Sequence, residues 1–157
     1  MRIALALGLV LVSVVPSLQA QTPTPGPAAA MGNTTPGTVT RVVLLRIKPG
    51  QTDAFWDDVR RNTKPIFEEY KRRGILVDYG YFTKATWDGP TDWDVGFTLT
   101  YSNWGALDNL GQRTDPVTIG HYGSVERRTA AQAARINTSE VAQSFLIRQQ
   151  TPNPISK

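Results

Sequence analysis

The sequence predicts an α+β domain in which a four-stranded antiparallel sheet carries two helices on one face. Three observations predict it. Several segments alternate apolar with polar residues and are rich in β-branched and aromatic types, as strands are. One long segment has apolar residues at helical spacing. The order of these segments is strand, helix, strand, strand, helix, strand.

The first predicted strand covers residues 38–48 (TVTRVVLLRIK) and ends at Pro49-Gly50, a turn signal. Both of its faces carry apolar residues, as expected for a central strand that is covered on two sides. This segment therefore belongs in the middle of the sheet.

The first predicted helix covers residues 52–73, and a short side-chain oxygen of Thr52 or Asp53 caps its first turn. Pro65 lies inside this helix, where it removes a backbone hydrogen bond and crowds the preceding turn, so a kink is expected near residues 62–64. The residues that share the apolar helical face are Phe55, Val59, Ile66 and Tyr70.

The second and third predicted strands cover residues 75–84 and 93–101, after Gly74 has ended the helix. Both alternate in character, so each presents one apolar face. The aromatic residues expected on that shared face are Tyr79, Tyr81, Trp93 and Phe97.

Ser102 or Asn103 is expected to cap a second helix, which Gly111 ends. An irregular stretch is expected at residues 113–123 and an Ala- and Arg-rich helix at residues 124–136. The last strand is expected at residues 141–149. The complete order is that of the ferredoxin-like βαββαβ plan, in which both helices lie on one face of the sheet.

A sheet with helices on one side leaves its other face to water or to a partner. The residues expected on this open face are Leu44, Arg46, Asp78, Phe82, Thr98, Leu146 and Arg148. This mixture suits a homodimer formed through the open sheet face, with Asp78 pairing across the interface with Arg46 and Arg148.

Residues 38–149 resemble the dimeric α/β-barrel proteins, whose ferredoxin-like subunits pack sheet to sheet. The resemblance lies in four segments: TVTRVVLLRIKPGQTDAFW, LVDYGYFTKA, WDVGFTLTYSNWGALD and VAQSFLIRQ. It implies a pocket in each subunit between sheet and helices. Members include cofactor-free monooxygenases acting on polyketide quinols, cyclases, isomerases, haem-dependent relatives and proteins without known activity, so fold alone does not assign a reaction.

Residues 1–20 have the pattern of a secretory signal peptide, with Arg2, an apolar run and Ala20 at the exit. The expected product is exported, secreted or periplasmic, and free of the membrane after cleavage. Residues 21–37 form a Pro-, Thr- and Ala-rich flexible leader, residues 38–150 the domain and residues 151–157 a loose tail.

The chain contains no cysteine, which excludes a disulfide framework and thiolate metal ligands. The formal charge is +4 and falls to +3 without Arg2. The basic residues are dispersed among acids, whereas nucleic-acid binding requires Lys and Arg concentrated on one face. Nucleic acid is therefore not the expected partner.

His121 is the only histidine and the only side chain that ordinarily titrates near neutrality. In a flexible Gly-His-Tyr-Gly loop it could serve as a general base, and Tyr122 could donate to a developing oxyanion. The alternatives are an exposed loop histidine and an axial haem ligand. No metal site is expected, because one histidine leaves carboxylates to supply the other ligands.

Aromatic residues near the predicted pocket are the candidates for ligand binding: Trp56, Tyr79, Tyr81 and Trp104. They could orient a planar ligand, or they could simply pack the core.

Two hypotheses for the function follow from these residues. The first is an exported protein that binds a small hydrophobic or aromatic ligand without catalysis. The second is a cofactor-free monooxygenase, cyclase or isomerase of an aromatic or polyketide-like substrate, with His121 as general base.

Overall fold

The computed structural model describes residues 33–86, 89 and 92–155. The predicted signal peptide and most of the predicted leader lie outside the described residues. Within those ranges, no helix is both long and apolar enough to cross a membrane.

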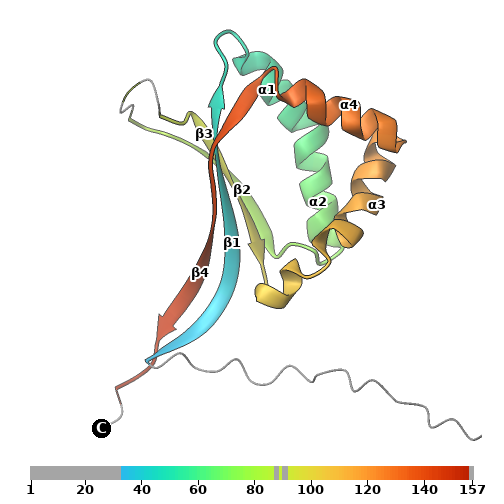
Figure 1. Cartoon of the computed structure of the whole chain (residues 1–157). Coiled ribbons are helices and arrows are strands. Elements are labelled where there is room, and N and C mark those ends of the chain that lie inside the picture. Colours follow the sequence, from blue (N-terminus) through green and yellow to red (C-terminus); the bar gives the residue numbers. More distant parts are fainter. Residues whose placement is uncertain (1–32, 87–88, 90–91, 156–157) are drawn as a thin grey trace, which may run out of the picture.

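Four antiparallel strands form one sheet in the order β2-β3-β1-β4. Their bounds are β1 Thr34–Ile47, β2 Asp78–Thr83, β3 Val95–Tyr101 and β4 Ser139–Pro152. All helices lie on one side of this sheet (Figure 1). The strand order and the one-sided helix layer are those of the ferredoxin-like plan, so the predicted fold class is confirmed.

The first helical segment runs without a break through three elements: α1 Thr52–Asp58, a π-helical turn Val59–Thr63 and α2 Lys64–Arg72. The Lys64 N–H donates to the carbonyl of Val59, five residues back. The π-helical turn thus stands directly before Pro65, where a kink was expected. The expected cap at Thr52 or Asp53 is wrong, because Thr52 is already the first residue of the helix and the N-cap position is Gln51, whose side chain makes no cap hydrogen bond.

The second helical region differs more from the prediction. A short 3₁₀ turn, η2 Trp104–Leu107, is capped by the Asn103 side chain, as expected. The chain then forms α3 Leu110–Tyr122 and α4 Val125–Arg135. Residues 113–123 were expected to be irregular, and Gly111 was expected to end a helix. Both expectations are wrong, because burial of Val117 against the core holds this weakly patterned segment helical.

The strand register assigns the sheet faces. Val43 lies opposite Phe97, and Phe97 opposite Tyr81, so these three residues share the helix-side face. Val42 lies opposite Phe145, which places Phe145 on the open face. Leu146 and Arg148, expected on the open face, lie opposite Arg41 and Val39 and therefore belong to the helix side. The register of β4 is one residue away from the predicted one.

Within the chain, the three charged residues expected on the open face are arranged differently from the prediction. Asp78 pairs with Lys71 at 2.8 Å, and Arg46 pairs with Glu140. Arg148 lies on the other face, because of the β4 register, so its expected placement beside the other two is wrong. An ion pair of Asp78 or Arg46 with a partner subunit stays a prediction.

Strands β1 and β4 extend beyond the rest of the sheet as a two-stranded arm, which projects past the helices in Figure 1. Thr34 lies opposite Pro152, within segments that were expected to be a flexible leader and a loose tail. The Thr35 hydroxyl donates to Asn153 Oδ1 at 2.6 Å. Pairing with each other orders the two segments, although neither has a strong strand pattern.

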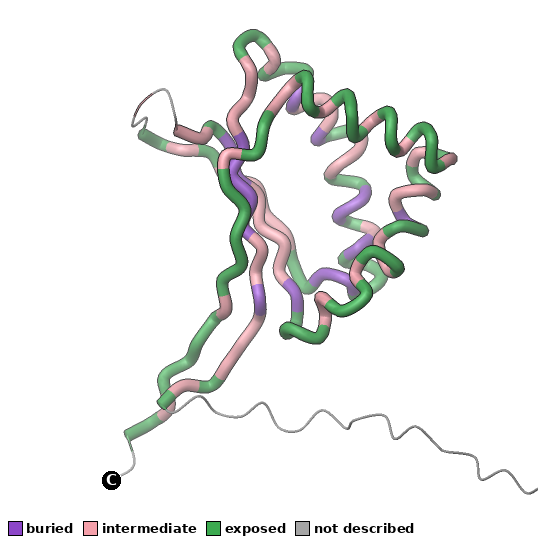
Figure 2. Tube along the Cα trace, in the orientation of Figure 1, coloured by how far each residue is buried: buried purple, intermediate pink, exposed green. Residues whose placement is uncertain are grey.

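The hydrophobic core lies between the sheet and the helices, where the buried residues of Figure 2 gather. It consists of two clusters of buried residues. One contains Ile66, Phe67, Tyr70, Ile75, Leu76, Tyr101 and Val117. The other contains Val43, Leu45, Phe55, Val59 and Val95. Tyr81 and Phe97 pack against both clusters, so the two are joined through the sheet.

Candidate functional site

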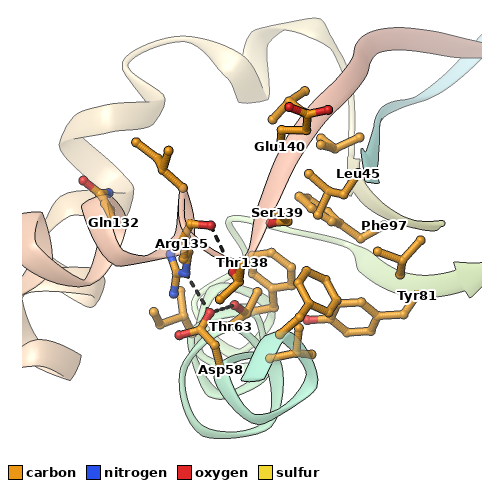
Figure 3. A pocket seen from close by; sticks show the side chains of 18 of the residues that line it. Leu45, Asp58, Thr63, Tyr81, Phe97, Gln132, Arg135, Thr138, Ser139 and Glu140 are labelled. Carbon is orange, nitrogen blue, oxygen red and sulfur yellow. Dashed lines mark hydrogen bonds and ion pairs between the residues drawn. The ribbon is translucent and has the colours of Figure 1, made fainter. Parts of the chain in front are cut away.

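A cavity of about 570 Å³ lies between the sheet and the helices, at the end where β4 begins (Figure 3). The helix-side face of β1, β2 and β3 forms one wall, and α1, the π-helical turn and α2 form a second. Side chains of α3, α4 and the start of β4 complete the lining. The pocket that the family resemblance implies is therefore present.

Most of the lining is apolar. The apolar residues are Val43, Leu45, Val95, Phe97 and Val141 from the sheet, Phe55, Val59, Ile66 and Phe67 from the first helical segment, and Ile136 after α4. The alternation of each strand and the helical spacing of the first segment direct these side chains to the same space. An apolar molecule in contact with them would be removed from water.

One side of the cavity is polar, and Arg135 is its centre. Arg135 Nε donates to Asp58 Oδ2 at 2.7 Å, and Arg135 Nη2 donates to the Tyr122 hydroxyl oxygen at 2.6 Å. Asp58 also accepts hydrogen bonds from Asn62 Nδ2 at 2.7 Å and from the Thr63 hydroxyl at 3.4 Å. Charge-assisted hydrogen bonds of this kind fix the geometry of a partly buried ion pair.

The hydrogen-bonded chain continues outward to His121. Because Asn62 Nδ2 donates to Asp58, the Asn62 carbonyl oxygen faces His121 Nε2, 3.0 Å away. His121 must therefore carry a proton on Nε2 and donate it to this oxygen. The histidine thus meets the polar side of the cavity through Asn62 and through the ring of Tyr122, whose centroid lies 4.9 Å from that of His121.

The Tyr81 hydroxyl is buried and has no hydrogen-bond partner among the described residues. Tyr81 belongs to β2, and Figure 3 shows its ring among the side chains that line the cavity. Buried hydroxyls in native proteins nearly always have a partner. An unsatisfied one that lines a cavity identifies a place where a ligand atom can bind.

The tyrosines that line the cavity, Tyr70, Tyr81 and Tyr122, remain protonated near neutrality. Burial is the main reason that the pKa of each of these three hydroxyls is raised. For Arg135, burial disfavours the charge, but the hydrogen bond and the negative charge of Asp58 outweigh it and raise the pKa of the guanidinium. Neutral phenols therefore line the cavity beside a compensated ion pair.

The structure brings two of the six predicted site residues to the cavity, Tyr81 and Tyr122. His121 does not line it. It lies in the last turn of α3 rather than in a flexible loop, beside a small cleft between α2 and α3. The expected loop placement is wrong because Gly123, with φ of 82°, ends the helix only after Tyr122.

The other three predicted site residues lie outside the lining. Tyr79 donates its hydroxyl hydrogen to Glu68 Oε1 at 2.5 Å, and burial is the main reason that its pKa rises to about 12. Trp56 packs edge-on against Tyr81, with ring centroids 6.5 Å apart. Trp104 is 46% exposed at the start of η2.

Trp93 does not join the aromatic group of Tyr79, Tyr81 and Phe97, as was expected. Its ring lies edge-on to Phe82, with centroids 5.4 Å apart, and Phe82 belongs to the open face opposite Gly96. Trp93 precedes β3, so the alternation of that strand does not extend to it.

Sequence reasoning missed the Asp58–Arg135 pair. The two residues are 77 positions apart and belong to segments whose polar residues were interpreted as solvent-facing. No local pattern marks them.

Among the described residues, no group of three or more His, Asp or Glu side chains could hold a metal ion. The sequence led us to expect no cofactor, with haem on His121 as an alternative, and nothing in this structure tests either possibility.

No family model matches the chain, and no curated protein matches it. Among solved structures, the chain is similar to HapK from Hahella chejuensis, with 12% identity over 76% of this chain and 99% of that chain, and a TM-score of 0.49. A dimeric ferredoxin-like protein from an uncultured marine organism has 12% identity, 77% and 100% coverage and a TM-score of 0.44.

A chlorite dismutase-like protein has 15% identity, 71% and 43% coverage and a TM-score of 0.41. These three are likenesses of fold at low identity. The fold assignment itself rests on the strand order of this chain, and no reaction is transferred from these proteins.

Proposed function

We propose that this domain binds a small, mainly apolar, aromatic molecule in the cavity between its sheet and helices. The observation that carries the proposal is a largely apolar cavity of about 570 Å³ with one polar side. Sites for small molecules are typically concave, apolar and of ~300–1,000 Å³, with a few polar groups that orient the ligand.

An aromatic ligand is favoured by the rings that surround the cavity. Phe67 lies 6.2 Å from Tyr81 and 5.7 Å from Phe97, measured between ring centroids. A planar ligand could stack against these rings or meet them edge-on, as aromatic side chains do with one another.

The proposal does not include a reaction, because Asp58 is already paired with Arg135 and His121 lies outside the lining.

Binding of naphthalene, followed by two-dimensional amide NMR, tests the proposal. We expect the amide signals of residues that line the cavity to shift. A Thr118→Trp variant should abolish the shifts, because Thr118 lines the cavity and the indole would fill it. Thr129→Trp is the matched control: its hydroxyl also donates to a carbonyl of its own helix, but it does not line the cavity. Absence of shifts in the unsubstituted protein would overturn the proposal.

We also propose that the domain forms a homodimer through the open sheet face. Phe145 and Ile147 lie on this face and are 44% and 50% exposed. Exposed apolar side chains that adjoin one another on a sheet face are typical of an interface. Light scattering should give a dimer mass, and Ile147→Lys should shift it towards the monomer. Val125→Lys, on the surface of α4, should not.

Export is proposed from the first 20 residues alone. Mass spectrometry of the protein from a secreted or periplasmic fraction tests it. We expect a mature chain that begins at Gln21, and a full-length chain in the cytoplasm would contradict export.

A further inference from the structure

We propose that the ligand of the cavity presents a hydrogen-bond acceptor oxygen, such as a ketone, quinone or phenolate oxygen, to the hydroxyls of Tyr81 and Tyr122. This inference rests on the proposed function and adds the chemical class of the ligand.

Tyr81 supplies the first donor. Its hydroxyl is buried and makes no hydrogen bond within the described part of the chain, although it lines the cavity. A phenol in this position loses its bonds to water without replacement. A ligand oxygen that accepts from it would restore the lost bond.

Tyr122 supplies the second donor. Its oxygen accepts from Arg135 Nη2 at 2.6 Å, so the guanidinium occupies one of the acceptor positions of the hydroxyl. Its single hydrogen has no acceptor among the described residues and is available to a ligand. Accepting from a cation also makes the hydroxyl a stronger donor, because hydrogen bonds in a chain polarise one another.

The carboxylates of the lining, by contrast, already have donors. Asp58 accepts from Arg135, Asn62 and Thr63, and Glu140 pairs with Arg46. The other polar side chains of the lining can accept as well as donate, and they include Gln132, Thr118, Thr138 and Ser139. The inference therefore rests on the two tyrosine donors, which favour an acceptor oxygen on the ligand.

Two nearly isosteric probes test this inference. 2-Acetonaphthone has the acceptor oxygen, and 2-isopropylnaphthalene lacks it. We expect Tyr81→Phe and Tyr122→Phe each to weaken ketone binding about threefold to tenfold, the usual value of one hydrogen bond. Binding of the hydrocarbon should change less than about twofold in both variants, since no hydrogen bond is lost. Tyr79→Phe is the control, because its hydroxyl binds Glu68 outside the lining.

A second measurement needs no variant. The carbonyl stretching frequency of bound 2-acetonaphthone should fall below its value in hexane, as expected for an oxygen that accepts hydrogen bonds. If both probes bind, either of two results would overturn the inference and leave the cavity proposal standing. One is a carbonyl frequency that stays at the hexane value. The other is a loss of affinity in the variants that is equal for the two probes. If neither probe binds, both proposals fail.

Discussion

Arg135 Nε lies 2.7 Å from Asp58 Oδ2 and joins the end of α4 to the end of α1 across 77 positions of sequence. The two side chains are 34% and 26% exposed, so water screens them only in part. This pair fixes the two helical segments that enclose the cavity relative to each other.

Replacing Arg135 tests how much that contact stabilises the domain. We expect Arg135→Ala to lower the free energy of unfolding by about 1–2 kcal/mol, because Asp58 and Tyr122 each lose a charge-assisted partner. Urea denaturation measures it. The control is Arg60→Ala, whose pair with Asp57 is exposed to water and should contribute little to the free energy of unfolding. Equal losses in the two variants would contradict a special role for Arg135.

The ring of the cross-strand neighbour Phe82 leaves no room for a side chain at Gly96. A Cβ atom at Gly96 would lie 2.2 Å from Phe82 Cζ, because the Phe82 ring covers this position of β3. We expect Gly96→Ala to destabilise the domain by about 1–3 kcal/mol through overpacking, measured by thermal unfolding.

The same substitution in a Phe82→Ala background should have a much smaller effect, since the clashing ring is absent. Gly120→Ala is the matched control in α3, where a Cβ meets no atom within 4 Å. There the change should stabilise the helix by about 0.5–1 kcal/mol. A large loss at Gly96 that persists without the Phe82 ring would refute the steric explanation.

Tyrosine ionisation should limit stability in alkali. All five tyrosines have a raised pKa in the folded domain, chiefly through burial, and for Tyr70 and Tyr79 it rises from 10.0 to about 12. The unfolded chain therefore releases these protons first. The stabilisation is fully present below pH 10 and is lost as the pH rises towards 12.

Absorbance at 295 nm during a pH titration measures this ionisation. We expect the folded protein to ionise its tyrosines above pH 10, together with unfolding, whereas the protein in urea should ionise them near the ordinary value. Ionisation of the folded protein near pH 10 with its circular dichroism intact would contradict this prediction.

His121 should have little influence on ligand binding. It contacts Asp58 only through Asn62, and Asp58 keeps Arg135 in its absence. We expect His121→Ala to change naphthalene affinity less than about twofold, as for a surface substitution. A tenfold loss of naphthalene affinity with the fold intact would show that His121 takes part in binding and would favour the catalytic hypothesis.

Local patterns predicted the fold better than they predicted the site. The alternation of β2 and β3 and the apolar spacing of the first helix supported the βαββαβ order, whereas the cavity between its layers was expected from the family resemblance. They also placed Tyr81 towards the helices, because a strand side chain has only two possible directions.

The parts that failed depend on distant contacts. Phe145, Leu146 and Ile147 are three consecutive apolar residues, so alternation could not decide which of two registers places Leu146 on the open face. Likewise, α3 contains Gly111 and Pro116, and packing of Val117, Leu110 and Tyr122 against the core favours the helix there. The contact of Arg135 with Asp58 has no signal in either local sequence.

The π-helical turn at Val59–Thr63 determines where the length of this chain can vary. A π-helical turn holds one residue more than an α-helical turn, so removing one residue there would leave a regular α-helix with α1 and α2 in their present orientation. Removing a residue within α1 or α2 would instead rotate the side chains on one side of the deletion by about 100°, so that Phe55 and Phe67 could no longer face the same cavity. Alignments of homologous sequences should therefore accept a gap of one residue between Asp58 and Pro65 but none inside the two flanking helices.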